Sequence, residues 1–172
     1  MRNALKTLLM LVTLTAGTAA GRAQQSTAPP DSSGKNTGAK PSATIRRINP
    51  PTLGQPNGYT HVVVATGGRT IYIAGQTAVD SHGDIVGRGD FRAQAKQAFE
   101  NLKTALAAAG VGFGDVVKVN YYVLDMTNAP VLREIRNSYL GSAFPASTLV
   151  EVRKLARDEF MLEIEAIAVS AR

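Results

Sequence analysis

The spacing of apolar and polar positions divides residues 45–172 into strands, turns and two helices. The apolar, β-branched run Tyr59–Ala65 predicts a strand, Gly67-Gly68 predicts a hairpin turn, and Thr70–Ala74 predicts the returning strand. Further strands are predicted at four segments of the same character: Ile45–Ile48, Val116–Leu124, Thr148–Arg153 and Met161–Val169.

Two other segments carry a helical period. Phe91–Ala109 contains no glycine or proline, and its apolar residues recur at spacings of three and four, which predicts an amphipathic helix. Asp90 supplies an N-cap, and Gly110 ends the helix. A second, shorter helix is predicted to begin after Asn128 and to end at Gly141.

This order of elements, β-β-β-α-β-α-β-β, predicts the α+β class, with both helices on one face of a sheet of five or six strands. The run Val62–Ala65 is apolar at successive positions, so both faces of its strand need cover. Two helices shield only one face of such a sheet. The other face is therefore predicted to pack against another subunit in a symmetric homo-oligomer. The alternative is a monomer with a partly exposed sheet.

The last predicted strand alternates between apolar and acidic residues. Period-two geometry places Leu162, Ile164 and Ala166 on one face, and Glu163 and Glu165 on the other. Carboxylates on an otherwise buried strand lower the stability of the fold unless they are paired or solvated, and they are retained at such cost where they have a function. One interpretation is structural, with paired or solvated glutamates at an open edge. The functional interpretation is a carboxylate in an interface cleft, where desolvation raises its pKa and suits it to activate water.

The first 44 residues differ in composition from the remainder. Residues 1–23 combine Arg2 and Lys6 with a short apolar core and a small-residue stretch, which predicts an export signal. The alternatives are an uncleaved anchor or an incorrectly assigned start codon. Residues 24–44 contain no aliphatic side chain larger than alanine, which predicts a disordered linker. The domain is then residues 45–172 of a periplasmic or secreted protein, with no membrane span after signal cleavage.

Composition and charge narrow the possible chemistry. The chain has no cysteine, which excludes disulfides, thiolate metal sites and cysteine nucleophiles. Its two histidines, His61 and His82, lack metal-ligand spacing, so no metal site is predicted. The formal net charge of +6 comes mostly from residues 1–44, and no basic run is interleaved with aromatic residues. Nucleic acid is therefore not predicted as a partner.

Five segments of the chain resemble the RidA/YjgF/YER057c/UK114 family, also called the endoribonuclease L-PSP family. They are IAGQTAVD (residues 73–80), FRAQAKQAFENLKTALAAAG (91–110), GDVVKVNYYVLDM (114–126), FPASTLVEV (144–152) and LEIEAIAV (162–169). The likeness covers nearly all of residues 45–172. It implies a chorismate-mutase-like α+β subunit with a six-stranded mixed sheet, two helices on one face, and a homotrimer with clefts between its subunits.

The resemblance also implies a chemistry. Archetypal members of the family hydrolyse 2-imino and enamine acids to 2-keto acids and ammonia without a cofactor, so the implied partner is a small-molecule ligand. Glu163 matches the glutamate that positions the attacking water, Tyr59 matches a pocket tyrosine, and Gly75 matches the glycine of the GQ turn. Ser147 and Thr148 lie in the segment that matches the family's substrate-binding PAR(S/T) motif.

The chain departs from the family within that motif. Ser147 stands where the family has the arginine that clamps the substrate carboxylate. Loss of such a buried ion pair costs on the order of 3–5 kcal/mol. Arg153 lies roughly 20 Å further along the strand, too far to replace it. Arg88 or Arg92, near the loop before the first helix, is the remaining candidate.

Two functions are open for an exported protein of this kind. The first is a cofactor-independent hydrolase that deaminates imine or enamine compounds at clefts between subunits, with Glu163 positioning water and no arginine clamp from the PAST segment. The second is a non-catalytic, ligand-binding or stress-related trimer. Ribonuclease activity is disfavoured, because no histidine or lysine pair is arranged for phosphoryl transfer.

Overall fold

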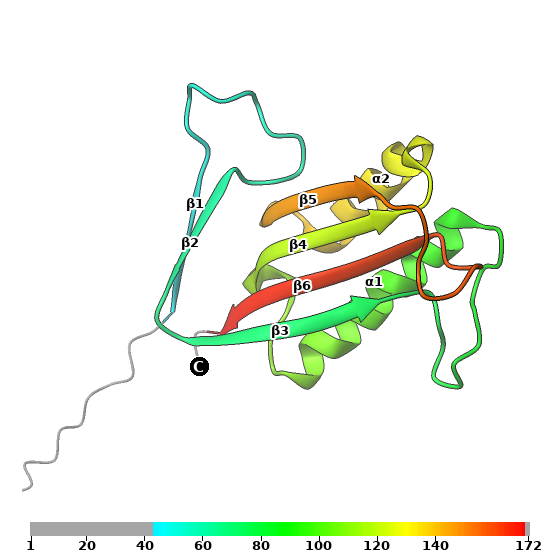
Figure 1. Ribbon diagram of the computed structural model, residues 1–172. Coiled ribbons are helices and arrows are strands. Elements are labelled where there is room, and N and C mark those ends of the chain that lie inside the picture. The colour runs from blue at the N-terminus through cyan, green and yellow to red at the C-terminus, as the bar shows by residue number, and fades with distance from the viewer. Residues whose placement is uncertain (1–42, 171–172) are drawn as a thin grey trace, which may run out of the picture. The chain divides into compact units, whose positions relative to one another are not determined.

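In the computed structural model, which describes residues 43–170, six strands and two α-helices follow one another in the predicted order (Figure 1). The strands are β1 (Thr44–Ile48), β2 (Val62–Thr66), β3 (Arg69–Gln76), β4 (Val116–Val123), β5 (Ala146–Glu151) and β6 (Leu162–Ser170). The helices are α1 (Phe91–Ala108) and α2 (Ala129–Leu140), with two 3-10 turns, η1 (Phe113–Asp115) and η2 (Met126–Asn128). The α+β class is confirmed.

Four strands form one sheet in the order β3-β6-β4-β5, with β4 and β5 parallel and the other neighbours antiparallel. Both α-helices lie on the same face, as predicted (Figure 1). The central strand β6 turns Leu162, Ile164 and Ala166 toward the helices, where they are buried with Phe99 and Leu102 of α1. The predicted alternation of β6 is therefore confirmed. We call the sheet surface turned away from the helices the open face.

The predicted single six-stranded sheet is not observed, and neither is the predicted pairing of the second and third strands. β1 and β2 form a separate antiparallel pair, while β3 pairs with β6. The Gly67-Gly68 turn is present, with φ of 70° and 74°. A side chain at Gly68 would overlap the carbonyl of Ser170, at the end of β6. The turn thus starts β3 along the edge of β6 and leaves β2 to pair with β1.

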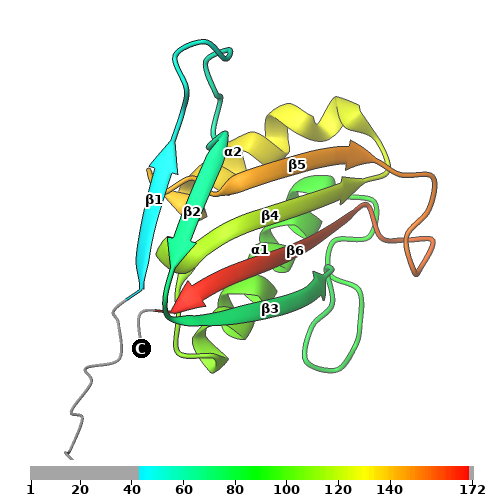
Figure 2. The ribbon, with the colours of Figure 1, turned by 60° about the vertical axis from the view of Figure 1, so that its left-hand side comes forward.

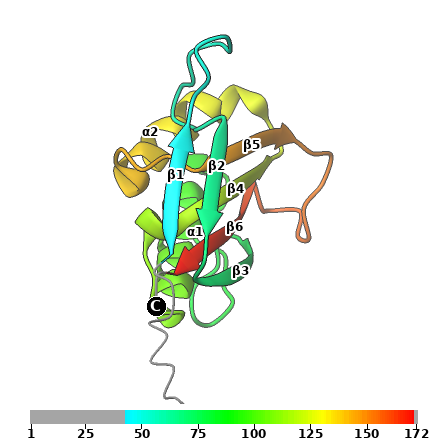
Figure 3. The ribbon, with the colours of Figure 1, turned by 90° about the vertical axis from the view of Figure 1, so that its left-hand side faces the viewer.

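The β1–β2 pair lies across one end of the four-stranded sheet (Figures 2 and 3). Arg47 of β1 donates from Nε to the Phe144 carbonyl at 3.2 Å. Thr60 donates from Oγ1 to the same carbonyl at 2.6 Å, and from its backbone N–H to the Pro145 carbonyl at 2.9 Å. These bonds fix the segment that carries Tyr59 beside the start of β5.

The helix α1 begins and ends as predicted. Asp90 accepts a hydrogen bond from the backbone N–H of Ala93 at 3.1 Å. On the inner face, the fully buried Gln94 donates to the Glu159 carbonyl at 2.8 Å and accepts from the Met161 N–H at 2.9 Å. This one side chain joins the helix to the segment that leads into β6.

The helix α2 is also confirmed, with one difference at its start. Asn128 occupies the N-cap position, but its side chain makes no capping hydrogen bond. Asp125 instead caps the preceding 3-10 turn, because its Oδ1 accepts from the Thr127 N–H at 2.8 Å. Pro130 lies in the first turn, and Gly141, with φ of 56°, ends the helix.

The predicted export signal (residues 1–23) and nearly all of the predicted linker (24–44) lie outside the described residues, and both stay predictions. β1 begins at Thr44, one residue before the predicted start of the domain. In the described part of the chain, no helix has the length and apolar character needed to cross a membrane.

Gln94 provides a test of this packing. Gln94→Ala leaves three backbone groups without their partner, the carbonyls of Gly87 and Glu159 and the N–H of Met161. We expect the free energy of unfolding to fall by about 2–3 kcal/mol, measured by chemical denaturation. Lys96→Ala, at an exposed position of the same helix, is the control and should change it by less than about 0.5 kcal/mol. Equal effects of the two substitutions would refute the role given to Gln94.

Candidate functional site

The open face of the sheet carries one hydrogen-bonded carboxylate. Glu165 of β6 lies opposite Asn120 of β4. Its Oε1 accepts from Asn120 Nδ2 at 2.7 Å and from the Tyr122 hydroxyl at 2.8 Å. These donors stabilise the charged form and hold the pKa of Glu165 below its ordinary value. Glu165 is therefore paired, as the structural interpretation predicts, although β6 is a central strand and not an open edge.

Glu163 lies two residues earlier on the same face and is in a different situation. It makes no hydrogen bond or ion pair with any described residue, and it is only half-buried. Its carboxylate lies over Gly75 of β3, in the space that a side chain at Gly75 would occupy. At this point the pairing of β3 with β6 shifts, between Ile73 and Gln76. The fold thus brings together two residues that the sequence places far apart.

Thr148 also faces the open side. Its hydroxyl oxygen accepts from the Nζ of Lys118 on the neighbouring strand at 2.6 Å. Partial burial lowers the pKa of this lysine, and the nearby Glu165 opposes that shift. Thr148 is therefore bonded within the sheet, and its side chain points away from that of its neighbour Ser147.

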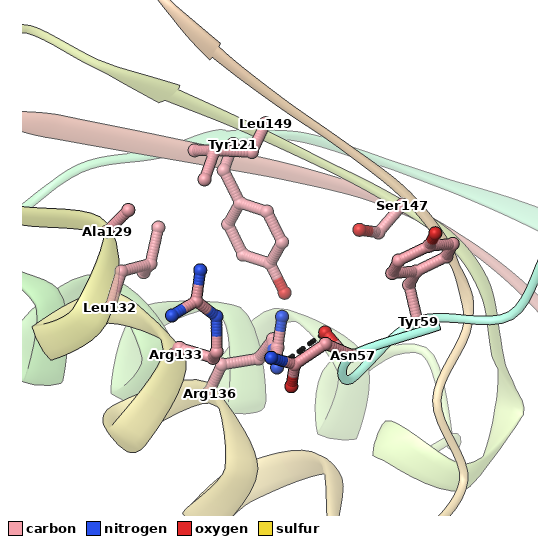
Figure 4. A pocket seen from close by; sticks show the side chains of 9 residues that line it. All are labelled: Asn57, Tyr59, Tyr121, Ala129, Leu132, Arg133, Arg136, Ser147 and Leu149. Carbon is pink, nitrogen blue, oxygen red and sulfur yellow. Dashed lines mark hydrogen bonds between the residues drawn. The ribbon is translucent and has the colours of Figure 1, made fainter. Parts of the chain in front are cut away.

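On the helix side of the sheet, β4, β5, α2 and the segment before β2 enclose a pocket of about 270 Å³ (Figure 4). We call it the helix-side pocket. It is lined by Asn57, Tyr59, Tyr121, Ala129, Leu132, Arg133, Arg136, Ser147 and Leu149. The strand register explains why Ser147 and Leu149 of β5 line this pocket. Ser147 lies opposite Val119 and Leu149 opposite Tyr121, and the side chains of these two β4 residues face the helices.

Arg136 is the most buried charge of this pocket, with 7% of its surface exposed. Its Nη2 donates to Asn137 Oδ1 at 2.9 Å, and its guanidinium lies over the Phe144 ring, 5.5 Å from the ring centroid. A Cβ at Gly58, where φ is 73°, would overlap the guanidinium, so glycine is required there on two grounds. Burial lowers the pKa of Arg136, although an arginine stays charged at neutral pH.

Three hydroxyl groups line the same pocket. Tyr121 is 2% exposed, and its Oη is the one buried side-chain oxygen or nitrogen, among the residues described, without a hydrogen-bond partner. Burial raises the pKa of this hydroxyl. Tyr59 packs edge-on against His61, with ring centroids 5.1 Å apart. The hydroxyls of Tyr59 and Ser147 make no hydrogen bond within residues 43–170.

The structure divides the predicted site residues between two faces of the sheet. Tyr59 and Ser147 line the helix-side pocket. Gly75 and Glu163 meet on the open face, and Thr148 lies on that face in a contact of its own. A single subunit therefore brings together two pairs of these residues, one on each face of the sheet, and leaves Thr148 apart from both.

The arginines that share a pocket with Ser147 are ones that the sequence did not reveal. Arg88 and Arg92, the candidates from sequence, form ion pairs with surface glutamates at 2.6 and 2.7 Å. The cations in the pocket with Ser147 are Arg133 and Arg136 of α2. The only signal for them was their spacing of three, which places both on one side of the predicted second helix.

The donor groups of the helix-side pocket indicate the kind of molecule it can hold. Two guanidinium groups and three hydroxyls offer hydrogen-bond donors beside apolar walls, which suits a small anionic or polar organic molecule. Across residues 43–170, no three histidine, aspartate or glutamate side chains cluster as a metal site requires.

Comparison with known proteins identifies the family. The family model described as Endoribonuclease L-PSP matches residues 52–170. The chain belongs to this family. A protein of the mite Dermatophagoides farinae, named 2-iminobutanoate/2-iminopropanoate deaminase, is 34% identical over 125 residues, which cover 72% of this chain and 95% of the relative. The mouse protein of the same name is 42% identical over 102 residues, covering 59% of this chain and 74% of the relative.

Solved structures agree with this assignment. The Rid-family protein YyfB of Yersinia pestis, described as of unknown function, is 38% identical, with a TM-score of 0.69 over 73% of this chain and 98% of that one. RidA from the Antarctic bacterium Psychrobacter is 35% identical, with a TM-score of 0.55 over 67% of this chain and 91% of that one. The resemblance inferred from sequence, and the RidA-like fold with it, are confirmed.

The network around Glu165 predicts a pH dependence. Because its pKa is lowered in the folded state, its hydrogen bonds stabilise the protein above the ordinary glutamate pKa of about 4.3 and are lost as the pH falls through the folded value. The double variant Asn120→Ala/Tyr122→Phe should therefore be less stable than wild type at neutral pH, and the difference should shrink as the pH falls below the ordinary glutamate pKa. Urea denaturation between neutral and acidic pH measures this difference in stability. A difference that does not change with pH would show that the hydrogen bonds to ionised Glu165 are not its cause.

Proposed function

We propose that this RidA-family protein is a cofactor-independent hydrolase that deaminates small imine or enamine compounds, in clefts between the subunits of an exported homotrimer. The reaction class is supported by the relatives from mite and mouse that bear the name of 2-iminobutanoate/2-iminopropanoate deaminase. In this chain, the observation that carries the proposal is the Glu163 carboxylate, which lies over Gly75 without a partner among the described residues.

In the proposed reaction, a water molecule bound to Glu163 attacks the electrophilic carbon of the imine. Glu163 accepts a proton from the water as the new C–O bond forms, and passes this proton to the imine nitrogen, which gives a neutral carbinolamine. Glu163 then accepts the proton of the carbinolamine hydroxyl as the carbonyl forms, and returns it to the nitrogen as the C–N bond breaks and ammonia leaves. The carboxylate of Glu163 is unchanged at the end, and the only co-reactant is water.

The division of the site between two faces supports the subunit arrangement. Glu163 and Ser147 of one chain cannot reach the same small molecule, because the sheet lies between them. A common cleft forms when the open face of one copy meets the helix-side pocket of the next. Such a head-to-tail contact closes into a ring of three when successive copies are related by a threefold rotation. Tyr72 and Val150, 78% and 38% exposed on the open face, supply apolar surface for this contact to bury.

A second candidate function is a non-catalytic trimer that binds a small ligand. Ser147 favours it, because a serine hydroxyl has neither the charge nor the reach of the family arginine. The two functions differ in what is expected of Glu163, which acts on water in the first and only lines a cleft in the second.

Substitutions at Glu163 and Gly75 test the hydrolase. Ammonia release from freshly generated 2-aminoacrylate should fall by about 10²–10⁴-fold in Glu163→Gln, which cannot accept a proton from water. Gly75→Ala should lower it as well, because the added methyl group displaces the Glu163 carboxylate. The midpoint of thermal unfolding should hardly change, since the overlapped atoms nearest the methyl group all belong to the Glu163 side chain and not to the backbone.

Gly112→Ala is the matched control for the glycine, because no atom lies within 4 Å of the added methyl group. This variant should release ammonia at the wild-type rate. If the wild type releases no ammonia from any imine tested, the hydrolase proposal fails and the ligand-binding function takes its place.

Mixed trimers test whether the site is shared between subunits. Tyr59→Ala damages the helix-side pocket, and Glu163→Gln damages the open face, so each homotrimer should be inactive. In trimers refolded from an equal mixture, an intact pocket meets an intact open face at about one quarter of the sites. Activity should therefore recover to about a quarter of wild type. No recovery, with mixing verified by native mass spectrometry, would show that each site lies within one chain.

A further inference from the structure

The helix-side pocket has an excess of positive charge that no described residue neutralises. Arg133 and Arg136 are its two charged residues, and none of its lining residues is acidic. Neither guanidinium forms an ion pair with any residue from 43 to 170. Charges removed from water are costly unless they are paired, so a pocket with two arginines and no acid is arranged to receive an anion.

The acid nearest in sequence is already committed elsewhere. Glu134 follows Arg133 directly, but its carboxylate accepts two hydrogen bonds from Arg92 of α1, at 2.7 and 2.8 Å. This bidentate pair lies on the surface and lowers the pKa of Glu134. The helix thus turns its glutamate outward, while Arg133 lines the pocket and makes no hydrogen bond within the described residues.

The Tyr121 hydroxyl is an independent indication of a ligand. A buried hydroxyl without a partner costs free energy, and such groups are rare in folded proteins. This hydroxyl lines the same pocket as the two guanidinium groups, and Figure 4 shows both Arg133 and Tyr121 pointing into it. An anion held by Arg133 would provide the acceptor that the hydroxyl lacks.

We propose that Arg133, with Arg136 and the Tyr121 hydroxyl, binds the carboxylate of a small organic acid in the helix-side pocket. The anchor lost from β5 at Ser147 is in this way supplied by α2, across the same pocket. The identification of the anion as an organic carboxylate rests on the proposed function. The pocket volume of about 270 Å³ fits a molecule of a few heavy atoms.

The two arginines of the proposed anion site have different roles. Arg136 is held by Asn137 and the Phe144 ring, so it contributes a fixed positive charge. Arg133 is half-buried and has no partner, so its planar guanidinium is free to form a bidentate contact with a carboxylate. We expect Arg133 to be the residue on which binding of the anion depends most.

Ligand-observed NMR titration tests this with pyruvate, the simplest 2-keto acid, on the full-length protein. Arg133→Gln should weaken pyruvate binding by about 10- to 100-fold, and Arg133→Lys by less. Tyr121→Phe, which keeps the ring and removes the hydroxyl, should weaken it by about 3- to 10-fold. Circular dichroism melts verify folding, and Arg153→Gln, which removes an exposed arginine outside the pocket, should bind pyruvate as wild type does.

A neutral ligand of similar shape separates charge recognition from damage to the pocket. Methyl pyruvate lacks the carboxylate, so any weak binding of it should be the same in wild type and Arg133→Gln. If Arg133→Gln weakens both ligands equally, or weakens neither, the inference is wrong.

The pyruvate-binding test can succeed or fail independently of the ammonia-release test of the proposed function. Pyruvate binding that depends on Arg133, in a protein without ammonia release, would support the anion site and refute the hydrolase. Ammonia release from 2-aminoacrylate, together with pyruvate binding that is insensitive to Arg133→Gln, would support the hydrolase and refute the anion site.

Discussion

The alternation of side chains on β6 is the constraint on which the fold and the site both depend. Leu162, Ile164 and Ala166 are buried beneath the helices, and the same period places Glu163 and Glu165 on the open face. A shift of one residue in the register would bury two carboxylates in the apolar core. The interaction that stabilises the sheet therefore also fixes where the candidate catalytic carboxylate lies.

A second pattern separates the scaffold from the site. Polar groups of the scaffold have partners: Gln94 bonds to three backbone groups, and Glu165 accepts from Asn120 and Tyr122. Glu163, Arg133 and the hydroxyl of Tyr121 have none among the described residues. A buried group without a partner, such as the Tyr121 hydroxyl, is expensive for a fold to keep, and all three groups line the surfaces on which the proposed chemistry depends.

The sequence allowed the elements of the fold to be predicted, but not all of their pairings. Hydrophobic periods and caps located α1 and β6 closely, because these signals are local. The Gly67-Gly68 turn was located as well, yet its strands do not pair, because the edge that β3 joins is decided by β6, far along the chain. The division of the chain into two sheets is a tertiary effect that no local pattern contains.

The site shows the same limit. Motif positions identified Glu163 and Gly75, which the fold brings into contact. The resemblance also showed that an arginine is missing at Ser147. It did not show where positive charge is supplied instead. The spacing of Arg133 and Arg136 places both on one side of α2, but which side faces β5 depends on how the helix packs, and no local pattern contains that information.

The most direct test of the central claim is cross-linking between the two faces. The chain has no cysteine, so the double variant Ser147→Cys/Glu163→Cys carries only the two introduced thiols. With a short bis-maleimide reagent, we predict covalent dimers and trimers on a denaturing gel, and none from either single variant, because the open face of each copy meets the pocket of the next. Only monomers, under conditions in which both thiols are shown to react, would contradict the shared cleft and with it the proposed mechanism.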